Sequence, residues 1–99
     1  MSRALTLRPK AIADLAEIWA FTAAQWSESQ AETYLTGLQA LFDLLCSQPD
    51  MARLRHEITP PVRLFPYRAH LVIYQDTADS LHILRLVHGL AQWQAYLQD

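Results

Sequence analysis

Three short β-type runs follow one another in the second half of this 99-residue chain, after two long amphipathic helical patterns. The runs occupy residues 62–65, 69–75 and 80–87, and each is rich in β-branched, aromatic and leucine side chains. The links between them, residues 66–68 and 76–79, are short and carry turn-forming residues. Because short links join neighbouring antiparallel strands, the three runs predict an antiparallel meander.

The first half of the chain predicts a leading strand and two helices. Residues 3–7 alternate like a short strand, and Pro9 then fits the first turn of a helix that the apolar spacing extends to about Trp26. Residues 27–30 form a capping box, Ser-Glu-Ser-Gln, which starts a second helix that ends near Ser47. Since the link is so short, we expect the two helices to pack as an antiparallel hairpin.

The element order is therefore β-α-α-β-β-β in a single domain over residues 1–99, with a short C-terminal helix or tail over residues 90–97. This is an α+β fold in which the helix hairpin packs on an antiparallel sheet. Residues 53–58 are a weak strand or an extended loop between the two halves. We expect Trp19 to be a core residue. Gly37 either marks a close crossing of the two helices or is tolerated at a cost of about 1 kcal/mol.

Charge and composition exclude several function classes. The net charge of -2 argues against a general nucleic-acid binder, so no direct specific DNA binding is expected. Residues 1–50 hold three basic against six acidic groups, and residues 51–99 hold five arginines against four acids. The chain starts without an apolar run of signal-peptide length, so we expect a cytoplasmic protein with no membrane span. The single cysteine, Cys46, is expected to be a core residue in a reducing compartment.

Neither a cofactor nor a metal is predicted from the sequence. A glycine-rich phosphate loop is absent, since Gly37 and Gly89 are the only glycines, and no CxxC or HxxxH spacing occurs. No strained nucleophile turn supports a Ser-His-Asp arrangement, so no catalytic residues are predicted on that basis. The histidines are dispersed over different segments, at His56, His70, His82 and His88.

Four motifs occur in a fixed order along the chain. An A-x-x-D-L-x-x-I helix spans residues 11–18, and the second helix closes with a leucine followed by a proline at residues 45–49. An H-x-x-x-Y strand follows at residues 70–74, and an I-x-R-x-x-H end at residues 83–88. In this order they resemble the ParE branch of the RelE/ParE toxin superfamily over nearly the whole chain. One departure is the Leu-Ala-Gln stretch at residues 90–92, where that family often has a basic residue and an aspartate.

The resemblance implies the toxin component of a type II toxin-antitoxin system, a class associated with plasmid stabilisation and growth inhibition. It implies a non-enzymatic inhibitor that binds DNA gyrase and is neutralised by a cognate, ParD-like antitoxin in a hetero-oligomer. The altered residues 90–92 leave open a degenerate, non-toxic member of the family that persists as an antitoxin partner.

A ribosome-dependent mRNA endonuclease of RelE type is the alternative. That chemistry needs cationic groups and a proton donor or acceptor that converge on one sheet face. Arg85 and His88 are three positions apart, so they would point to opposite faces unless the strand ends before Gly89. A single lysine and the acidic net charge also fit poorly with an RNA-lined site. The candidates for this activity are Arg53, Arg55, Arg63, Arg68, Arg85, Glu57, His88 and Tyr96.

Two sets of binding residues are predicted, because Trp, Tyr and Arg dominate binding energies at interfaces. An apolar groove between the helix hairpin and the sheet edge would accept a disordered amphipathic antitoxin segment, with Trp26 and Tyr34 as candidates. Arg53 and Arg55 have an alternative interpretation as the solvated face of an edge strand. The candidates for target or antitoxin binding are Arg53, Arg63, Arg68, Arg85, His88, Trp93 and Tyr96.

Overall fold

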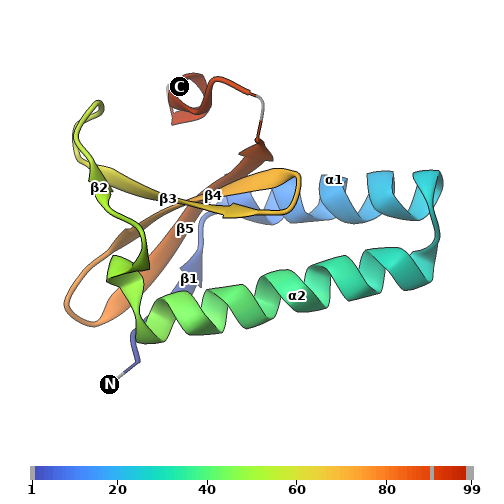
Figure 1. The fold of residues 1–99 in the computed structure, drawn as a ribbon, viewed down its shortest axis with the longest axis horizontal. Coiled ribbons are helices and arrows are strands. Elements are labelled where there is room, and N and C mark those ends of the chain that lie inside the picture. The colour runs from blue at the N-terminus through green and yellow to red at the C-terminus, as the bar shows by residue number, and fades with distance from the viewer. Residues whose placement is uncertain (1, 90, 98–99) are drawn as a thin grey trace.

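The computed structural model describes residues 2–89 and 91–97, and it has two helices on one side of a five-stranded sheet (Figure 1). Residues 1, 90, 98 and 99 lie outside the described residues, so the part of the predicted C-terminal element that falls on Leu90 does too. The elements are β1 Ala4–Leu7, α1 Pro9–Gln25, α2 Glu28–Ser47, η1 Pro49–Met51, β2 Leu54–Arg55, β3 Val62–Tyr67, β4 His70–Asp76, β5 Ser80–His88 and η2 Trp93–Leu97.

The sheet has the strand order β1-β5-β4-β3-β2 and is mixed. The meander β3-β4-β5 is antiparallel, as the sequence predicts. The leading strand β1 adds to it in parallel, with Ala4 opposite Ser80, because the chain returns through the helix hairpin before it enters the meander. The β3–β4 link is shorter than predicted. It is the two-residue turn Arg68-Ala69, in which Arg68 has the positive φ of 51° that tight hairpin turns favour.

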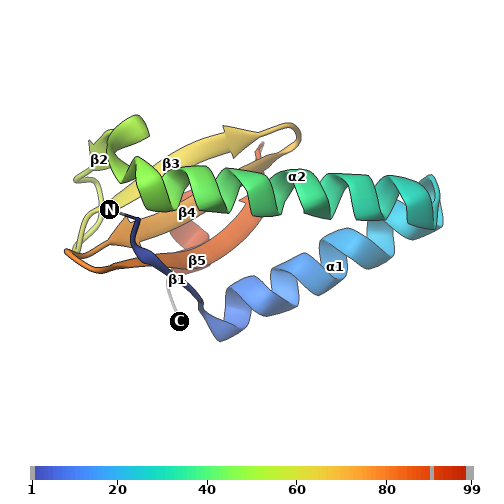
Figure 2. The same ribbon diagram turned by 90° about the horizontal axis from the view of Figure 1, so that it is seen from below.

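The helix boundaries follow local signals in the sequence. Pro9 occupies the first turn of α1, where its missing N–H costs nothing. The hydroxyl of Ser27 accepts a hydrogen bond of 3.0 Å from the amide of Gln30, so the predicted N-cap of α2 is confirmed. The two helices lie side by side as an antiparallel hairpin in both views (Figure 2). None of the helices in the described part of the chain is long and apolar enough to cross a membrane.

Apolar side chains pack on both faces of the sheet. One cluster lies between the sheet and the helix hairpin and includes Leu38 and Tyr74, which are fully buried. Cys46 belongs to this cluster, so its predicted core position is confirmed. The second cluster covers the opposite face, where Trp93 of η2 packs against strand residues such as Ile73. Figure 1 shows η2 on the side of the sheet away from α2, so the C-terminal segment closes the second cluster.

The apolar stripe of α1, which repeats at three and four positions, predicts one side of the helix toward the sheet, but the helix packs with another side. The predicted stripe consists of Ile12, Leu15, Ala16, Trp19, Ala23 and Trp26. The buried residues of α1 are Ala11, Asp14 and Ile18. Trp19 is 37% exposed, so its predicted core position is wrong, and Ile12 is 54% exposed. The helix is turned because Asp14 faces inward and is held by groups of β5, an interaction that periodicity alone does not reveal.

Gly37 marks a close approach, but its neighbour is β3 and not α1. A Cβ added at Gly37 would collide with the hydroxyl of Tyr67. The same hydroxyl donates a hydrogen bond of 3.3 Å to the carbonyl oxygen of Tyr34. Glycine at this position therefore lets a β3 side chain reach the backbone of α2, and the predicted crossing of the two helices is not its cause.

Candidate functional site

A groove of about 640 Å³ lies between α1, the start of α2 and the last part of β5. Strand β1 pairs with β5 only as far as Ile83, so the later residues of β5 form a sheet edge beside α1. The groove is mainly apolar, and its lining includes Phe21 and Trp26, which are 65% and 76% exposed. It therefore lies between the helix hairpin and the sheet edge, where the sequence predicts a groove.

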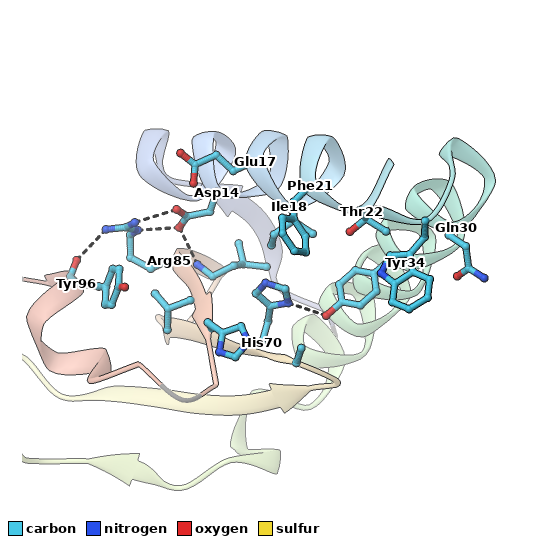
Figure 3. A pocket seen from close by; sticks show the side chains of 15 residues that line it. Asp14, Glu17, Ile18, Phe21, Thr22, Gln30, Tyr34, His70, Arg85 and Tyr96 are labelled. Carbon is cyan, nitrogen blue, oxygen red and sulfur yellow. Dashed lines mark hydrogen bonds and ion pairs between the residues drawn. The ribbon is translucent and has the colours of Figure 1, made fainter. Parts of the chain in front are cut away.

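One end of the groove is organised by an ion pair between Asp14 and Arg85 (Figure 3). The Arg85 guanidinium donates to the two carboxylate oxygens of Asp14 at 2.7 and 2.9 Å. The Leu86 N–H donates to the same carboxylate at 2.9 Å. Asp14 is 7% exposed, and its hydrogen bonds raise the pKa of Arg85 above its ordinary value. The pair therefore fixes α1 to the edge of the sheet.

Arg85 also holds the C-terminal segment. Its guanidinium donates at 3.1 Å to the carbonyl oxygen of Tyr96 and lies 5.2 Å from the centre of the Tyr96 ring. Tyr96 lies on η2 and lines the groove. Through Arg85, helix α1, strand β5 and η2 are joined at one point.

Aromatic and imidazole rings line the groove farther along. The Tyr34 hydroxyl lies 2.7 Å from Nδ1 of His70, and the rings of His70 and His88 lie 5.9 Å apart between their centres. Burial and the neighbouring His88 hold the pKa of His70 below its ordinary value. Burial raises the pKa of the Tyr34 hydroxyl, so that phenol stays protonated at neutral pH. The cluster therefore offers hydrogen-bonding groups beside an apolar wall.

The structure brings together five of the binding residues that the sequence predicts. They share the groove lining although they come from α1–α2, β5 and η2. Arg85 and His88 border the same groove although they are three positions apart, because the groove lies along the free edge at the end of β5. The five are Trp26, Tyr34, Arg85, His88 and Tyr96.

The other predicted residues lie elsewhere. Arg63 is tied internally, since its guanidinium donates to Asp76 at 2.9 Å and to the carbonyl oxygen of Ala52. Trp93 is buried in the cluster on the opposite face of the sheet. Arg53, before β2, and Arg68, in the β3–β4 turn, are exposed outside the groove lining. Only these last two arginines of the predicted set therefore present side chains to solvent away from the groove.

The sequence reasoning missed several groove residues. Asp14 and Glu17 lie off the apolar stripe of the first helix and therefore looked like solvated residues. Phe21 also lies off that stripe, and a large aromatic residue at such a position is a signal that could have indicated an exposed binding surface. The sequence singles out His70 only as part of the H-x-x-x-Y motif, because its contact with Tyr34 joins residues 36 positions apart.

The described residues contain no group of three or more His, Cys, Asp or Glu side chains that could hold a metal ion. The groove has apolar walls, an arginine whose charge is matched by Asp14, and a Tyr34–His70–His88 cluster. Such an arrangement can take up a ligand that is mainly apolar and carries a few polar groups.

Comparison with known proteins gives consistent matches. Residues 5–93 match the family described as the ParE toxin of the type II toxin-antitoxin system, parDE. The chain is 35% identical over 89 residues to Toxin ParE1 of Mycobacterium tuberculosis, covering 89% of this chain and 91% of that protein. It is 28% identical over 91 residues to Toxin ParE1 of Caulobacter vibrioides, covering 92% and 94% of the two chains.

A solved structure has a similar fold. It is the chromosomal ParDE TA system from P. aeruginosa, with a TM-score of 0.74. The match covers 88% of this chain and 96% of that one, at 18% sequence identity. At that identity the likeness shows the fold, in agreement with the α+β order that the sequence predicts.

Proposed function

This chain belongs to the ParE toxin family of type II toxin-antitoxin systems, and we propose that it inhibits growth by binding DNA gyrase and is neutralised by a cognate antitoxin. The antitoxin, a ParD-like protein, occupies the groove between α1, α2 and β5 and forms a hetero-oligomer with the toxin. The toxin acts in the cytoplasm, without a cofactor and without specific DNA binding.

The groove is the observation that carries the antitoxin proposal. Phe21 and Trp26 are large apolar side chains that are mostly exposed and that line a concave site beside a sheet edge. Contiguous apolar surface of this kind is a mark of protein–protein interaction sites. A disordered amphipathic segment that folds on binding could cover it. The solved relative from P. aeruginosa is a ParDE system, which supports a ParD-like partner for this chain.

The gyrase proposal rests on family membership and on the kinds of residue left for a second surface. Arg63 and Arg85 form ion pairs with Asp76 and Asp14, respectively, so their charges are engaged in stabilising the fold. Arg53 and Arg68 are exposed outside the groove and remain candidates for contact with gyrase. Inhibition by binding needs such a recognition surface and no reacting group of its own.

A RelE-type endonuclease has less support. Its candidates are separated, since Arg55 pairs with Glu57 beside β2 whereas Arg85, His88 and Tyr96 line the groove. Phosphodiester chemistry needs cations and proton-transfer groups around one phosphate. The degenerate, non-toxic alternative depends on residues 90–92, of which Leu90 lies outside the described residues.

Induced expression in a bacterium that lacks the antitoxin tests the proposed function. Growth arrest with a DNA damage response is the expected result. Arrest accompanied by cleavage of mRNA on ribosomes would favour the nuclease, and normal growth would favour the degenerate member. Coexpression of the protein encoded by the adjacent open reading frame should restore growth, and a failure to do so would contradict the antitoxin proposal.

A further inference from the structure

The two imidazoles of the groove lie side by side and differ in their exposure to solvent. The ring centres of His70 and His88 are 5.9 Å apart with the rings inclined at 71°. His70 is half-buried, and His88 at the end of β5 is exposed. Figure 3 shows His70 pointing into the groove, with Nδ1 joined to the hydroxyl of Tyr34. The pair is therefore accessible to a segment that lies in the groove.

The hydrogen bond to Tyr34 occupies Nδ1 of His70, and Nε2 is the other ring nitrogen. The Tyr34 phenol stays protonated, since burial raises its pKa; at 2.7 Å it can donate to Nδ1 of His70 or accept from it, and it also donates at 3.4 Å to the carbonyl oxygen of Tyr67. A neutral imidazole that accepts at one nitrogen carries its proton on the other. Among the described residues, the imidazole side chain of His70 has a hydrogen bond only through Nδ1. In a protonated His70 both ring nitrogens carry a proton, so Nε2 then donates to a ligand.

The charges around His70 lack a carboxylate that is free to pair with it. Asp14 favours its charged form from α1, but that carboxylate already binds Arg85 and the Leu86 amide. Glu17, the other acid that lines the groove, lies at the Arg85 end in Figure 3. The remaining titratable neighbours of His70 are Tyr34 of α2 and His88 of β5. Tyr34 in turn lies near Tyr67 of β3 and Arg68 of the β3–β4 turn.

We propose that the segment which fills this groove places a carboxylate side chain against His70 and His88, so that binding is coupled to the uptake of a proton. The proposal rests on the proposed function and adds a chemical requirement for the partner. A carboxylate accepts from the Nε2–H of His70, and charge-assisted bonds of this kind are the stronger ones. The apolar side chains of the same segment pack against Phe21 and Trp26. The partner is thus an amphipathic segment with an acid among its groove-facing residues.

Proton uptake follows from the difference between the free and the bound groove. In the free protein His70 is largely neutral at pH 7, because burial and His88 lower its pKa. A partner carboxylate raises that pKa, so His70 gains a proton on binding. A purely apolar partner would bury His70 further and leave it neutral. The number of protons taken up therefore distinguishes the two kinds of partner.

Calorimetric titration at pH 7 in two buffers with different ionisation enthalpies measures that number. The probe is the protein encoded by the open reading frame adjacent to that of this chain, titrated into the intact toxin. The expected result is an uptake approaching about one proton and an affinity that rises by up to about tenfold for each pH unit below 7. His70→Gln should abolish the uptake, and the exposed His88→Gln should reduce it.

Matched variants separate the inference from the proposed function. His56→Gln changes an exposed histidine outside the groove lining and should leave the uptake unchanged. On the partner, one Glu→Gln or Asp→Asn change should remove the uptake. Tight binding without proton uptake would overturn the inference and leave the antitoxin proposal standing. The absence of any binding would overturn both.

Discussion

Asp14 on α1 and Arg85 on β5 are joined by two hydrogen bonds of 2.7 and 2.9 Å across 71 positions of sequence. The same Asp14 carboxylate accepts from the Leu86 amide, and the same Arg85 guanidinium donates to the Tyr96 carbonyl oxygen. A helix, the central part of a strand edge and the C-terminal η2 are thus held in one network. The groove has its shape because this network fixes the distance between α1 and β5.

Breaking the pair should destabilise the fold strongly. Arg85→Ala leaves the Asp14 carboxylate buried without its cation, and such a change lowers the free energy of unfolding by about 3–5 kcal/mol. Urea unfolding followed by tryptophan fluorescence measures the loss. Arg53→Ala, at an exposed arginine, is the control and should have little effect. A loss for Arg85→Ala of less than about 1 kcal/mol, as in a surface pair, would contradict this role.

Gly37 should tolerate a methyl group only when the hydroxyl of Tyr67 is removed. Gly37→Ala adds a Cβ that collides with that hydroxyl, so the variant should lose about 1–3 kcal/mol of stability despite its better helix propensity. In a Tyr67→Phe background the same change should cost clearly less. Thermal unfolding of the two single variants and the double variant tests the coupling. Additive losses would mean that the contact does not limit position 37.

Acid should destabilise the protein partly through His70. Its pKa in the folded protein is lowered by burial and by His88, so the unfolded chain binds a proton more readily. This contribution is fully present above the unfolded pKa of about 6.5 and is lost as the pH falls through the lower folded pKa. Urea midpoints at pH 5, 6, 7 and 8 should converge for the wild type and His70→Gln on the acid side. Parallel pH curves for the wild type and His70→Gln would contradict a contribution of His70 to acid destabilisation. The exposed His56→Gln serves as the control.

Much of the fold was predictable because its signals are local. The Ser27 cap, the start of α1 at Pro9 and the succession of short strands each depend on neighbours in sequence. The parallel pairing of β1 with β5 could not be read in this way, because it joins the two ends of the chain. Residues 53–58 predict only a weak strand or an extended loop, and β2 within that range is two residues long.

The sequence predicts where the groove lies, between the helix hairpin and the sheet edge, but identifies only some of the residues that line it. Trp26 and Tyr34 were identified as residue types that favour interfaces, whereas Asp14 looked like a solvated residue beside the apolar stripe. Its burial is driven by Arg85, a partner far away in sequence, and that burial turns α1 so that Trp19 becomes exposed. Apolar periodicity reflects only the apolar residues, so it does not reveal a helix face that an ion pair turns toward the sheet.

Antitoxin affinity should depend on one side of α1. Phe21→Ser removes an exposed aromatic side chain from the groove and should weaken binding about 10- to 100-fold, as expected for a central interface residue. Ile12→Ser is the matched control, since nine positions of helix place Ile12 on the opposite side of α1 and it too is exposed. Surface-based binding assays with the adjacent gene product measure both. Equal losses for the two variants, or none for Phe21→Ser, would be inconsistent with binding in the groove.

The most direct test of gyrase inhibition is a supercoiling assay with purified DNA gyrase and the purified toxin. The proposed function predicts that the toxin blocks supercoiling and leaves cleaved DNA, and that a stoichiometric amount of antitoxin prevents both effects. Arg53→Ala and Arg68→Ala, at the exposed arginines outside the groove, should weaken the inhibition while leaving antitoxin binding intact. A normal rate of supercoiling in the presence of excess toxin would contradict the central claim.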